Sequence, residues 1–338
     1  MPRHRTPRLA HRVHAYTHEP YQPALDRLRR IPGRPIPAAS EAQQHLELEV
    51  LRHIAYCGIT DGHGWRPGDA PFAIDWLRPL PDALEISVKE EALPDLLGAL
   101  LPTWTPGGEP WGVRGLRPSF TRQGVELRRL GLRGLVRLRA VRQASWLRAV
   151  AIAHEIWDDP DAVQVLWRTH PDQMHPEEEA HARRFDAGYA PAAEGRTQMA
   201  STASALLRRH MIFRVASPAT DIRLWMNPGS IQLEWGGGPD HVTVLNALLD
   251  PVFGVSGRVK DRCTCREAKP GGPSCYSVEV EFADAFVRLR RARDGWSEAS
   301  ERFSARSRQR RAEALQRHGA VLRTSGSGPA RRRRRSAC

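Results

Sequence analysis

Three cysteines and one histidine are the side chains best suited to hold a metal ion. Cys263, Cys265 and Cys275 form a C-x-C-x9-C pattern in a Gly/Pro-rich stretch, and His241 is a possible fourth ligand. Thiolates and imidazole are ligands that zinc prefers. Zinc knuckles normally use C-x2-C pairs, whose two intervening residues let both sulfurs face inward. The pattern therefore leaves zinc open and favours free thiols in an inserted loop, with no structural metal and no other cofactor.

Other local patterns do not assign a catalytic residue. His170, His175 and His181 lie among acidic residues, but their spacing matches no closed metal site, and an exposed acidic connector accounts for them. The stretch "WGGGPDH" (235–241) has the glycines of a phosphate-binding turn but lacks G-K-[ST], and Asp240 is expected to cap a helix there. No serine lies in a G-x-S-x-G pattern.

Arginine provides the clearest chemical signal. The formal net charge is +13, and lysine occurs only at positions 89, 260 and 269. Residues 1–40 carry eight arginines against two acids, and residues 291–338 carry fourteen against four. Residues 127–150 add seven arginines and no acid. Basic ends and one basic internal segment on a mildly acidic body are the distribution expected of a protein that binds a polyanion.

Two of these segments supply candidate phosphate contacts. Residues 127–150 alternate Leu or Val with Arg, which would bury one face and present a row of arginines on the other. The C-terminal tail ends in five consecutive arginines after a Ser/Gly-rich stretch, and guanidinium groups on a flexible chain neutralise phosphates without reading sequence. The candidate nucleic-acid-binding residues are Arg128, Arg129, Arg133, Arg137, Arg139, Arg308, Arg310, Arg311, Arg331, Arg332, Arg333, Arg334 and Arg335.

The internal basic segment overlaps one copy of an internal repeat. "LGALLP" (97–102) matches "LNALLD" (245–250), "WGVRG" (111–115) matches "FGVSG" (253–257), and "VRLR" occurs at 136–139 and again at 287–290. Val125-Glu126 and Val278-Glu279 fall between them in the same order, and Trp146 and Trp296 follow as expected core anchors. Matches that keep one order predict a duplication.

Each copy shows the same expected elements. A helix precedes two alternating runs joined by turn residues, as in "DIRLWM-NPG-SIQLEW", and a second helix and a second strand pair follow. The prediction is an α+β fold with two α-ββ-α-ββ-α units, antiparallel sheets, a pseudo-twofold relation and basic disordered termini. The expected divisions are a basic N-terminal arm (1–39), the first unit (40–146), an acidic helical connector (147–196), the second unit (197–318) and a disordered polybasic tail (319–338).

The resulting functional expectation is a non-enzymatic nucleic-acid-binding or nucleic-acid-associated protein, with DNA or RNA as partner. Two alternatives stay open: a protein-interaction or assembly component whose tail is an address, and a metal-dependent nuclease-like enzyme with unrecognised ligands. No apolar leader or bilayer-length segment is visible, so the chain is expected to be intracellular, cytoplasmic or nucleoid-associated, neither secreted nor in a membrane.

Overall fold

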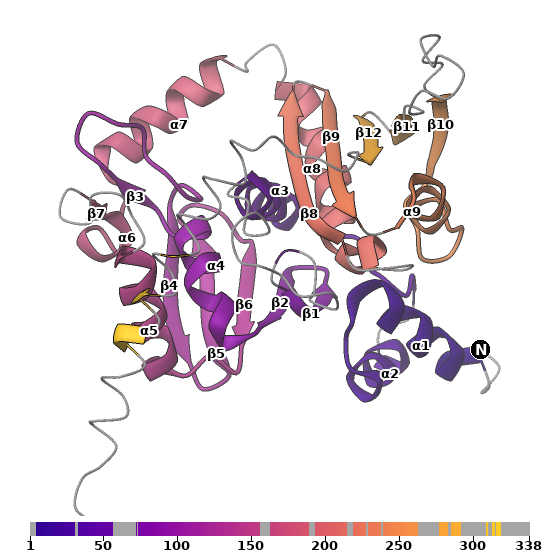
Figure 1. Cartoon of the computed structure of the whole chain (residues 1–338), viewed down its shortest axis with the longest axis horizontal. Helices are drawn as coiled ribbons and strands as arrows, with labels where there is room; N and C mark the ends of the chain where they lie inside the picture. Colours follow the sequence, from indigo (N-terminus) through magenta and orange to yellow (C-terminus); the bar gives the residue numbers. More distant parts are fainter. Residues whose placement is uncertain are drawn as a thin grey trace, which may run out of the picture.

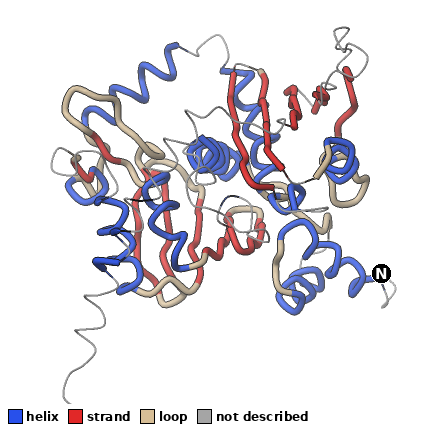
Figure 2. The backbone as a smooth tube through the Cα atoms, in the orientation of Figure 1, coloured by secondary structure: helices blue, strands red, loops and turns tan. Residues whose placement is uncertain are grey.

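The protein is a mixed α+β molecule with two five-stranded sheets (Figures 1 and 2). The computed structural model describes most of the chain between residues 5 and 291 and a few residues near the C-terminus. The described residues are 5–30, 33–56, 72, 74–155, 163–188, 193–214, 219–227, 229–237, 239–262, 277–282, 285–291, 309, 313–314 and 316–318. Among them, no helix has both the length and the apolar character needed to cross a membrane.

The first sheet is built from the sequence between residues 74 and 139. Its strands are β1 (Ile74–Leu80), β2 (Ala83–Val88), β4 (Leu116–Thr121), β5 (Gly124–Arg129) and β6 (Leu135–Arg139), in the spatial order β1-β2-β6-β5-β4. A short 3-10 helix, η2 (Glu90–Ala92), leads from β2 into α4 (Leu93–Leu100). Helix α5 (Gln143–Glu155) follows β6 and packs against α4, with Trp146 only 1% exposed. This buried tryptophan is the core anchor expected from the sequence.

The second sheet has the same plan. Its strands are β8 (Ala219–Asn227), β9 (Ser230–Gly237), β10 (Gly257–Arg262), β11 (Ser277–Phe282) and β12 (Ala285–Arg291), in the order β8-β9-β12-β11-β10. Helix α9 (His241–Leu248) connects β9 to the later strands, as α4 does in the first sheet. The carboxylate of Asp240 accepts a hydrogen bond from the Thr243 N–H at 2.6 Å, so this residue caps α9 as expected.

The sheets are mixed rather than antiparallel, which corrects the sequence prediction. In each sheet one junction is parallel, between β2 and β6 in the first and between β9 and β12 in the second. Each V-R-L-R segment is the strand that makes this junction, so each unit has a hairpin, a helix and a three-stranded meander. In each V-R-L-R segment, apolar residues and arginines alternate with the two-residue period of a strand. The segments form strands, although their composition would also be compatible with a helix.

Matching residues occupy matching places in the two sheets. Val125 lies opposite Leu138 in the first sheet, and Val278 lies opposite Leu289 in the second. At the end of α4, the Val113 N–H donates to the Leu100 carbonyl at 2.9 Å. The Val255 N–H makes the same bond to the Leu248 carbonyl at the end of α9, at 2.6 Å.

A glycine stands at each of these contacts because the backbone passes too close for a side chain. A Cβ on Gly112 would come within 2.5 Å of the Leu101 carbonyl oxygen, and one on Gly254 would come within 2.3 Å of the Leu248 carbonyl oxygen. Gly112 also has a φ of +86°, which favours glycine. The first glycines of "WGVRG" and "FGVSG" are therefore packing requirements.

The N-terminal segment is folded, not a disordered arm. It forms α1 (Arg5–Thr17) and α2 (Tyr21–Arg30), whose apolar face includes Val13 and Leu25 in the core. Tyr16 stacks on Phe253 and donates to the Ala247 carbonyl, which ties α1 to the second half. Arg8, Arg12, Arg29 and Arg30 are exposed on the polar face of this amphipathic helix pair, whereas Arg27 is buried. The arginine-rich composition therefore concealed the helices.

Helices α3 (Glu41–Tyr56) and α8 (Ala193–Leu207) join the two halves near the middle of Figure 1 and pack on each other. Their contact contains a buried ion pair between Glu47 and Arg208, whose side chains are 0% and 1% exposed. Ser204 and Gln43 also donate to the Glu47 carboxylate, at 2.6 and 2.7 Å. The Gln43 side-chain oxygen also accepts a hydrogen bond from the Leu135 N–H at 2.7 Å, which ties α3 to β6.

Short elements lie between the halves. They are β3 (Thr103–Trp104), paired with β7 (Gln164–Val165), then α6 (Leu166–Thr169), α7 (Pro176–Gly188) and, after α8, the 3-10 helix η5 (His210–Arg214). The expected boundary at residue 146 falls inside α5, so the start of the connector belongs to the helix that covers the first sheet.

Candidate functional site

Three arginines of 127–150, on strands β5 and β6, project from the outer face of the first sheet. Val125 and Val136 are buried on the inner face, while Arg128, Arg137 and Arg139 alternate with buried residues and face outward. The expected division into an apolar face and an arginine face is therefore present in β5 and β6. Arg133 is exposed in the turn between these strands, and Arg129 is half-buried at the end of β5.

Carboxylates hold most of these arginines in place. Arg137 lies between Glu85 and Glu126, with N···O distances of 2.7 Å to each, and its side chain is 20% exposed. Arg128 binds the second oxygen of Glu126 at 2.9 Å. Hydrogen bonds from Arg137 hold the pKa of Glu126 below its usual value, against the opposing effect of burial. The Arg137 guanidinium is thus committed to intramolecular partners.

The same ladder of charges continues across the sheet to the N-terminal helices. Arg78 on β1 bridges Glu85, at 3.0 Å, and Glu19, at 2.8 Å, and Arg27 binds the other oxygen of Glu19 at 2.9 Å. Glu19 is fully buried, so this end of the outer face is covered by protein. Most arginines on the outer face of the first sheet therefore form ion pairs with carboxylates of the same chain.

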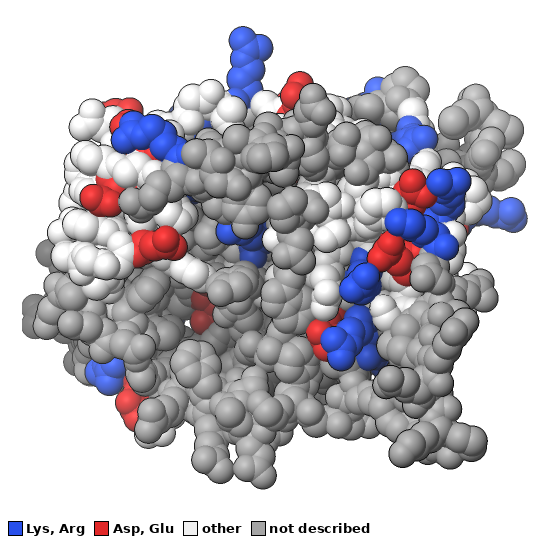
Figure 3. All heavy atoms as spheres, turned by 90° about the horizontal axis from the view of Figure 1, so that it is seen from above, with Lys and Arg blue, Asp and Glu red and all other residues white. Residues whose placement is uncertain are grey.

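The outer face of the second sheet is more open. Arg258 and Lys260 on β10 and Arg288 and Arg290 on β12 have side chains between 49% and 80% exposed. Their carboxylate partners, Glu281, Glu279 and Glu234, are only 26%, 23% and 11% exposed. The cations therefore extend outward over the acids. Figure 3 shows blue and red side chains together at the right, where Figure 1 places β10 to β12.

One aromatic ring lies within this group. The Lys260 ammonium is 3.8 Å from the centroid of the Phe286 ring, which is the distance of a cation–π contact. We call Arg258, Lys260, Phe286, Arg288 and Arg290 the β10–β12 basic face. Sequence reasoning did not select these residues, because they are divided between two segments, and the strand between those segments carries Glu279 and Glu281, which lower the charge of the region. The signal available was the alternation itself in "GRVKDR" and "FVRLRR".

Several candidate residues lie outside the part of the chain that the structure describes. They are Cys263, Cys265, Cys275, Arg308, Arg310, Arg311 and Arg331 to Arg335. His241, the fourth candidate metal ligand, is the first residue of α9. Within the described residues, no group of three or more His, Cys, Asp or Glu side chains is arranged to hold a metal ion.

The histidines of the connector surround a buried structural ion pair. Glu178 on α7 binds Arg117 at 2.8 Å and accepts hydrogen bonds from the backbone N–H groups of Gly115 and His175. Burial would raise the pKa of Glu178, but these hydrogen bonds outweigh it and hold the pKa below its usual value. His170 and His175 meet edge to face at 4.8 Å. The arrangement fixes α7 to β4.

A second buried cluster lies beside α3. The His53 Nε2 is 3.9 Å from the Glu49 Oε2, and the Arg114 Nη2 approaches the same oxygen at 3.7 Å. His53 also meets the edge of Trp111. Burial lowers the pKa of His53 to about 4, so the ring is neutral at neutral pH, while the positive charges around Glu49 hold its pKa below the usual value despite burial.

Comparisons with known proteins give no family for this chain: no protein-family model, no curated protein and no solved structure matches it.

Proposed function

We propose that this chain is a nucleic-acid-binding protein that contacts phosphates without catalysing a reaction on them. The observation that carries the proposal is the β10–β12 basic face, where four cations are about half exposed or more and their carboxylate partners lie lower. Outward guanidinium and ammonium groups can release counterions from a phosphate backbone and so bind it independently of sequence.

The chain after β12 adds to this charge. Residues 292–338 follow directly from the basic face and carry thirteen arginines, including the five consecutive ones at 331–335. Arg128, Arg133 and Arg139 on the first sheet are a second set of candidate contacts. Arg137 is a weaker candidate than its neighbours because two carboxylates already hold it.

A variant of the basic face tests the proposal. Replacing Arg258, Lys260, Arg288 and Arg290 together by Gln should weaken binding to duplex DNA of any sequence. The slope of log K against log salt should fall by up to about 3.6, near 0.9 for each phosphate that the variant no longer neutralises. The cost in folding free energy should be small, because Glu279 and Glu281 keep about a quarter of their side chains exposed and the buried Glu234 loses only a long pair of 3.8 Å.

The matched control removes four cations from the first sheet and its turns, by replacing Arg122, Arg128, Arg133 and Arg139 with Gln. All four are exposed or half-exposed. A smaller change in the salt slope is expected for this variant. Equal binding by the wild type and the β10–β12 variant at about 0.1 M salt would contradict the proposal, and loss confined to the control would move the interface to the first sheet.

A protein partner is the second candidate, favoured by the mixed charge of the same face. Glu279 and Glu281 lie between the cations, and such alternation is complementary to a protein surface of mixed charge as well as to phosphates. Binding of a protein partner that does not change when nucleic acid is added, but is lost in the same Gln variant, would favour this candidate.

We also propose that the two halves are copies that arose by duplication and pack about a pseudo-twofold axis. Support comes from the common strand order, the common parallel junction and the matched register of Val125 and Val278. The helix that precedes each sheet also packs on its counterpart, α3 on α8. On this proposal, the outer faces of the two sheets are equivalent surfaces that diverged after duplication. The cations are exposed in the second sheet and held in ion pairs in the first.

A further inference from the structure

The Phe286 side chain lies on the outer face of the second sheet, among cations rather than in the core. Along β12, Val287 and Leu289 are buried on the inner face, whereas Phe286 is half-buried on the same side as Arg288. The Lys260 ammonium lies over the ring, 3.8 Å from its centroid, and the Lys260 side chain is 49% exposed. This face of the ring is therefore covered by a solvent-exposed side chain.

The neighbours of Phe286 on the β9 side are small. Phe286 lies opposite Ser230 in the parallel junction, and its N–H donates to the Gly229 carbonyl at 3.1 Å. A Cβ on Gly229 would meet no described atom within 4 Å, so space is open beside this turn. The residues next to the ring on this side therefore leave room for a flat group.

Cations stand close to the ring. Arg288 follows Phe286 by two residues, about 6.6 Å along the strand. Arg258 pairs at 2.6 Å with Glu281, the residue opposite Phe286 on β11. The side chains of Arg258 and Arg288 are 80% and 54% exposed. Exposed ion pairs are weak, so a phosphate can compete with the carboxylates for both guanidinium groups.

We propose that the β10–β12 basic face prefers single-stranded nucleic acid, with one unpaired base stacked on the Phe286 ring in place of the Lys260 ammonium. The inference rests on the proposed function, because phosphate contacts of the same face hold the strand. In a duplex each base is already paired and stacked between its neighbours, so only an unpaired base can lie on the ring. The displaced Lys260 ammonium can then bind a phosphate of the strand.

The magnitudes favour the base over the ammonium. A cation–π contact at an exposed site changes an equilibrium by about twofold to fivefold. Stacking one base on an aromatic side chain changes affinity by about fivefold to 150-fold. Every base has a π-face, so this contact is independent of sequence, as the phosphate contacts are.

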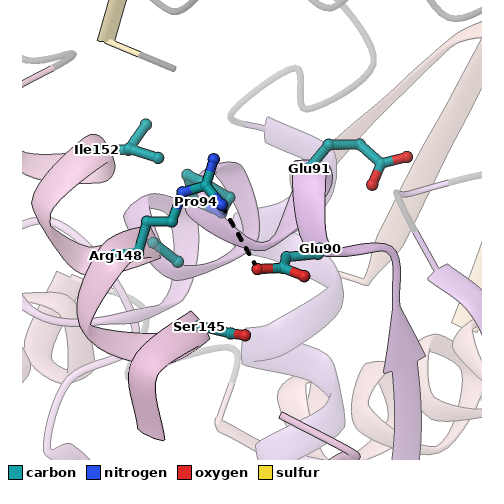
Figure 4. A pocket seen from close by; sticks show the side chains of 7 residues that line it. Glu90, Glu91, Pro94, Ser145, Arg148 and Ile152 are labelled. Carbon is teal, nitrogen blue, oxygen red and sulfur yellow. Dashed lines mark ion pairs between the residues drawn. The ribbon is translucent and has the colours of Figure 1, made fainter. Parts of the chain in front are cut away.

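The groove between α4 and α5, on the first half of the chain, lacks this combination (Figure 4). Glu90 and Arg148 face each other across it at 3.7 Å, and Glu91 lies at the same rim. The residues that line this groove include no aromatic side chain. A base therefore has no ring to stack on there, and the acidic rim opposes a phosphate backbone.

Fluorescence anisotropy with the full chain tests the stacking. The probes are a labelled oligothymidylate, an oligouridylate and a duplex, all of one length, at about 0.1 M salt. Phe286→Leu should weaken binding of single strands about fivefold or more and change duplex binding by less than about twofold. The slope of log K against log salt should stay the same, because the variant removes no charge. The single strand that binds more tightly identifies DNA or RNA as the source of the base.

Two further variants keep the test decisive. Phe286→Tyr retains a ring and should bind single strands about as tightly as the wild type. The matched control is Phe120→Leu on β4 of the first sheet, where the Phe120 side chain is 49% exposed and meets the edge of Trp146. This control should leave single-strand affinity unchanged.

The outcomes separate the stacking from the phosphate contacts. Unchanged single-strand binding by Phe286→Leu, an equal loss in the Phe120→Leu control, or equal losses on single strand and duplex overturns the inference. If Phe286→Leu binds normally while the four Gln replacements of the basic face lower the salt slope, only the stacking fails. If the Gln replacements also leave the slope unchanged, the proposed function fails with it.

Discussion

Individual side chains in this protein are perturbed mainly by burial beside charged neighbours, and His53 is the clearest case. Desolvation lowers the pKa of His53 to about 4 from 6.5, although Glu49 favours the protonated form. Arg52, Arg114 and His181 add positive charge nearby and act in the same direction as burial. A neutral imidazole in the folded state has a direct consequence for stability.

The sign of that consequence follows from proton uptake. As the pH falls from 6.5 toward 4, His53 is protonated in the unfolded chain before it is protonated in the folded one, so unfolding is favoured. The free energy of unfolding should lose up to about 1.4 kcal/mol per pH unit from this group. Urea titrations of the wild type and of His53→Asn between pH 7 and pH 5 measure the difference.

The comparison uses slopes, because the substitution itself can shift the absolute stability. The wild type should lose stability more steeply with falling pH than His53→Asn, and the difference in slope should approach one proton near pH 5. Parallel pH profiles for the two proteins would show that His53 titrates alike in both states and would contradict the shifted pKa.

At the scale of elements, the contact between α3 and α8 depends on one fully satisfied ion pair. The Arg208 guanidinium donates to both oxygens of Glu47, at 2.7 and 2.8 Å, and to the carbonyls of Pro37 and Leu80. Removing one charge would leave the other buried without its partner. Such losses typically cost about 3 to 5 kcal/mol, whereas replacing both partners by apolar residues is often much less costly.

Glu47→Gln should therefore lower the free energy of unfolding by about 3 to 5 kcal/mol in urea titrations, and the double replacement of Glu47 by Leu and Arg208 by Met should recover much of that loss. The exposed pair Glu179 and Arg183 provides the control, and Glu179→Gln should change stability by less than about 1 kcal/mol. If the double variant is as unstable as the single one, the loss in free energy of unfolding comes from losing the Glu47–Arg208 interaction itself and not from leaving one buried charge unpaired.

The elements that were predictable from the sequence are those with a local signal. The hairpins formed by β1 with β2 and by β8 with β9 were predicted from alternation and turn residues, and Asp240 was predicted to cap α9. The third strand of each meander was missed, because its pairing partner lies about fifty residues away in sequence and no local signal specifies a parallel junction. The helices α1 and α2 were missed because arginine composition was given more weight than their apolar spacing.

At the scale of the whole molecule, charge could be predicted but its exposure could not. The sequence shows where arginines are dense, yet Arg137 is held between Glu85 and Glu126 while Arg288, which stands in the matching strand position, is 54% exposed. The difference is set by Glu85, whose counterpart opposite Arg288 is the uncharged Gln232. Such a difference depends on the pairing of strands β2 and β9 with their parallel neighbours, which became visible only in the fold.

The tail and the β10–β12 basic face should act as separable contacts. Deleting residues 324–338 removes five arginines and no acid, and the deleted part includes none of the described residues, so the cost in folding free energy should be small. The slope of log K against log salt for duplex DNA should fall by up to about 4.5.

If tail and face contact different phosphates, combining the deletion with the four Gln replacements should give the sum of the two changes in slope, because distant, independent sites are additive. A combined change no larger than that of the deletion alone would mean that the tail is the whole interface. No change in slope on deletion would leave the tail outside the interface, and binding would then have to depend on the folded faces.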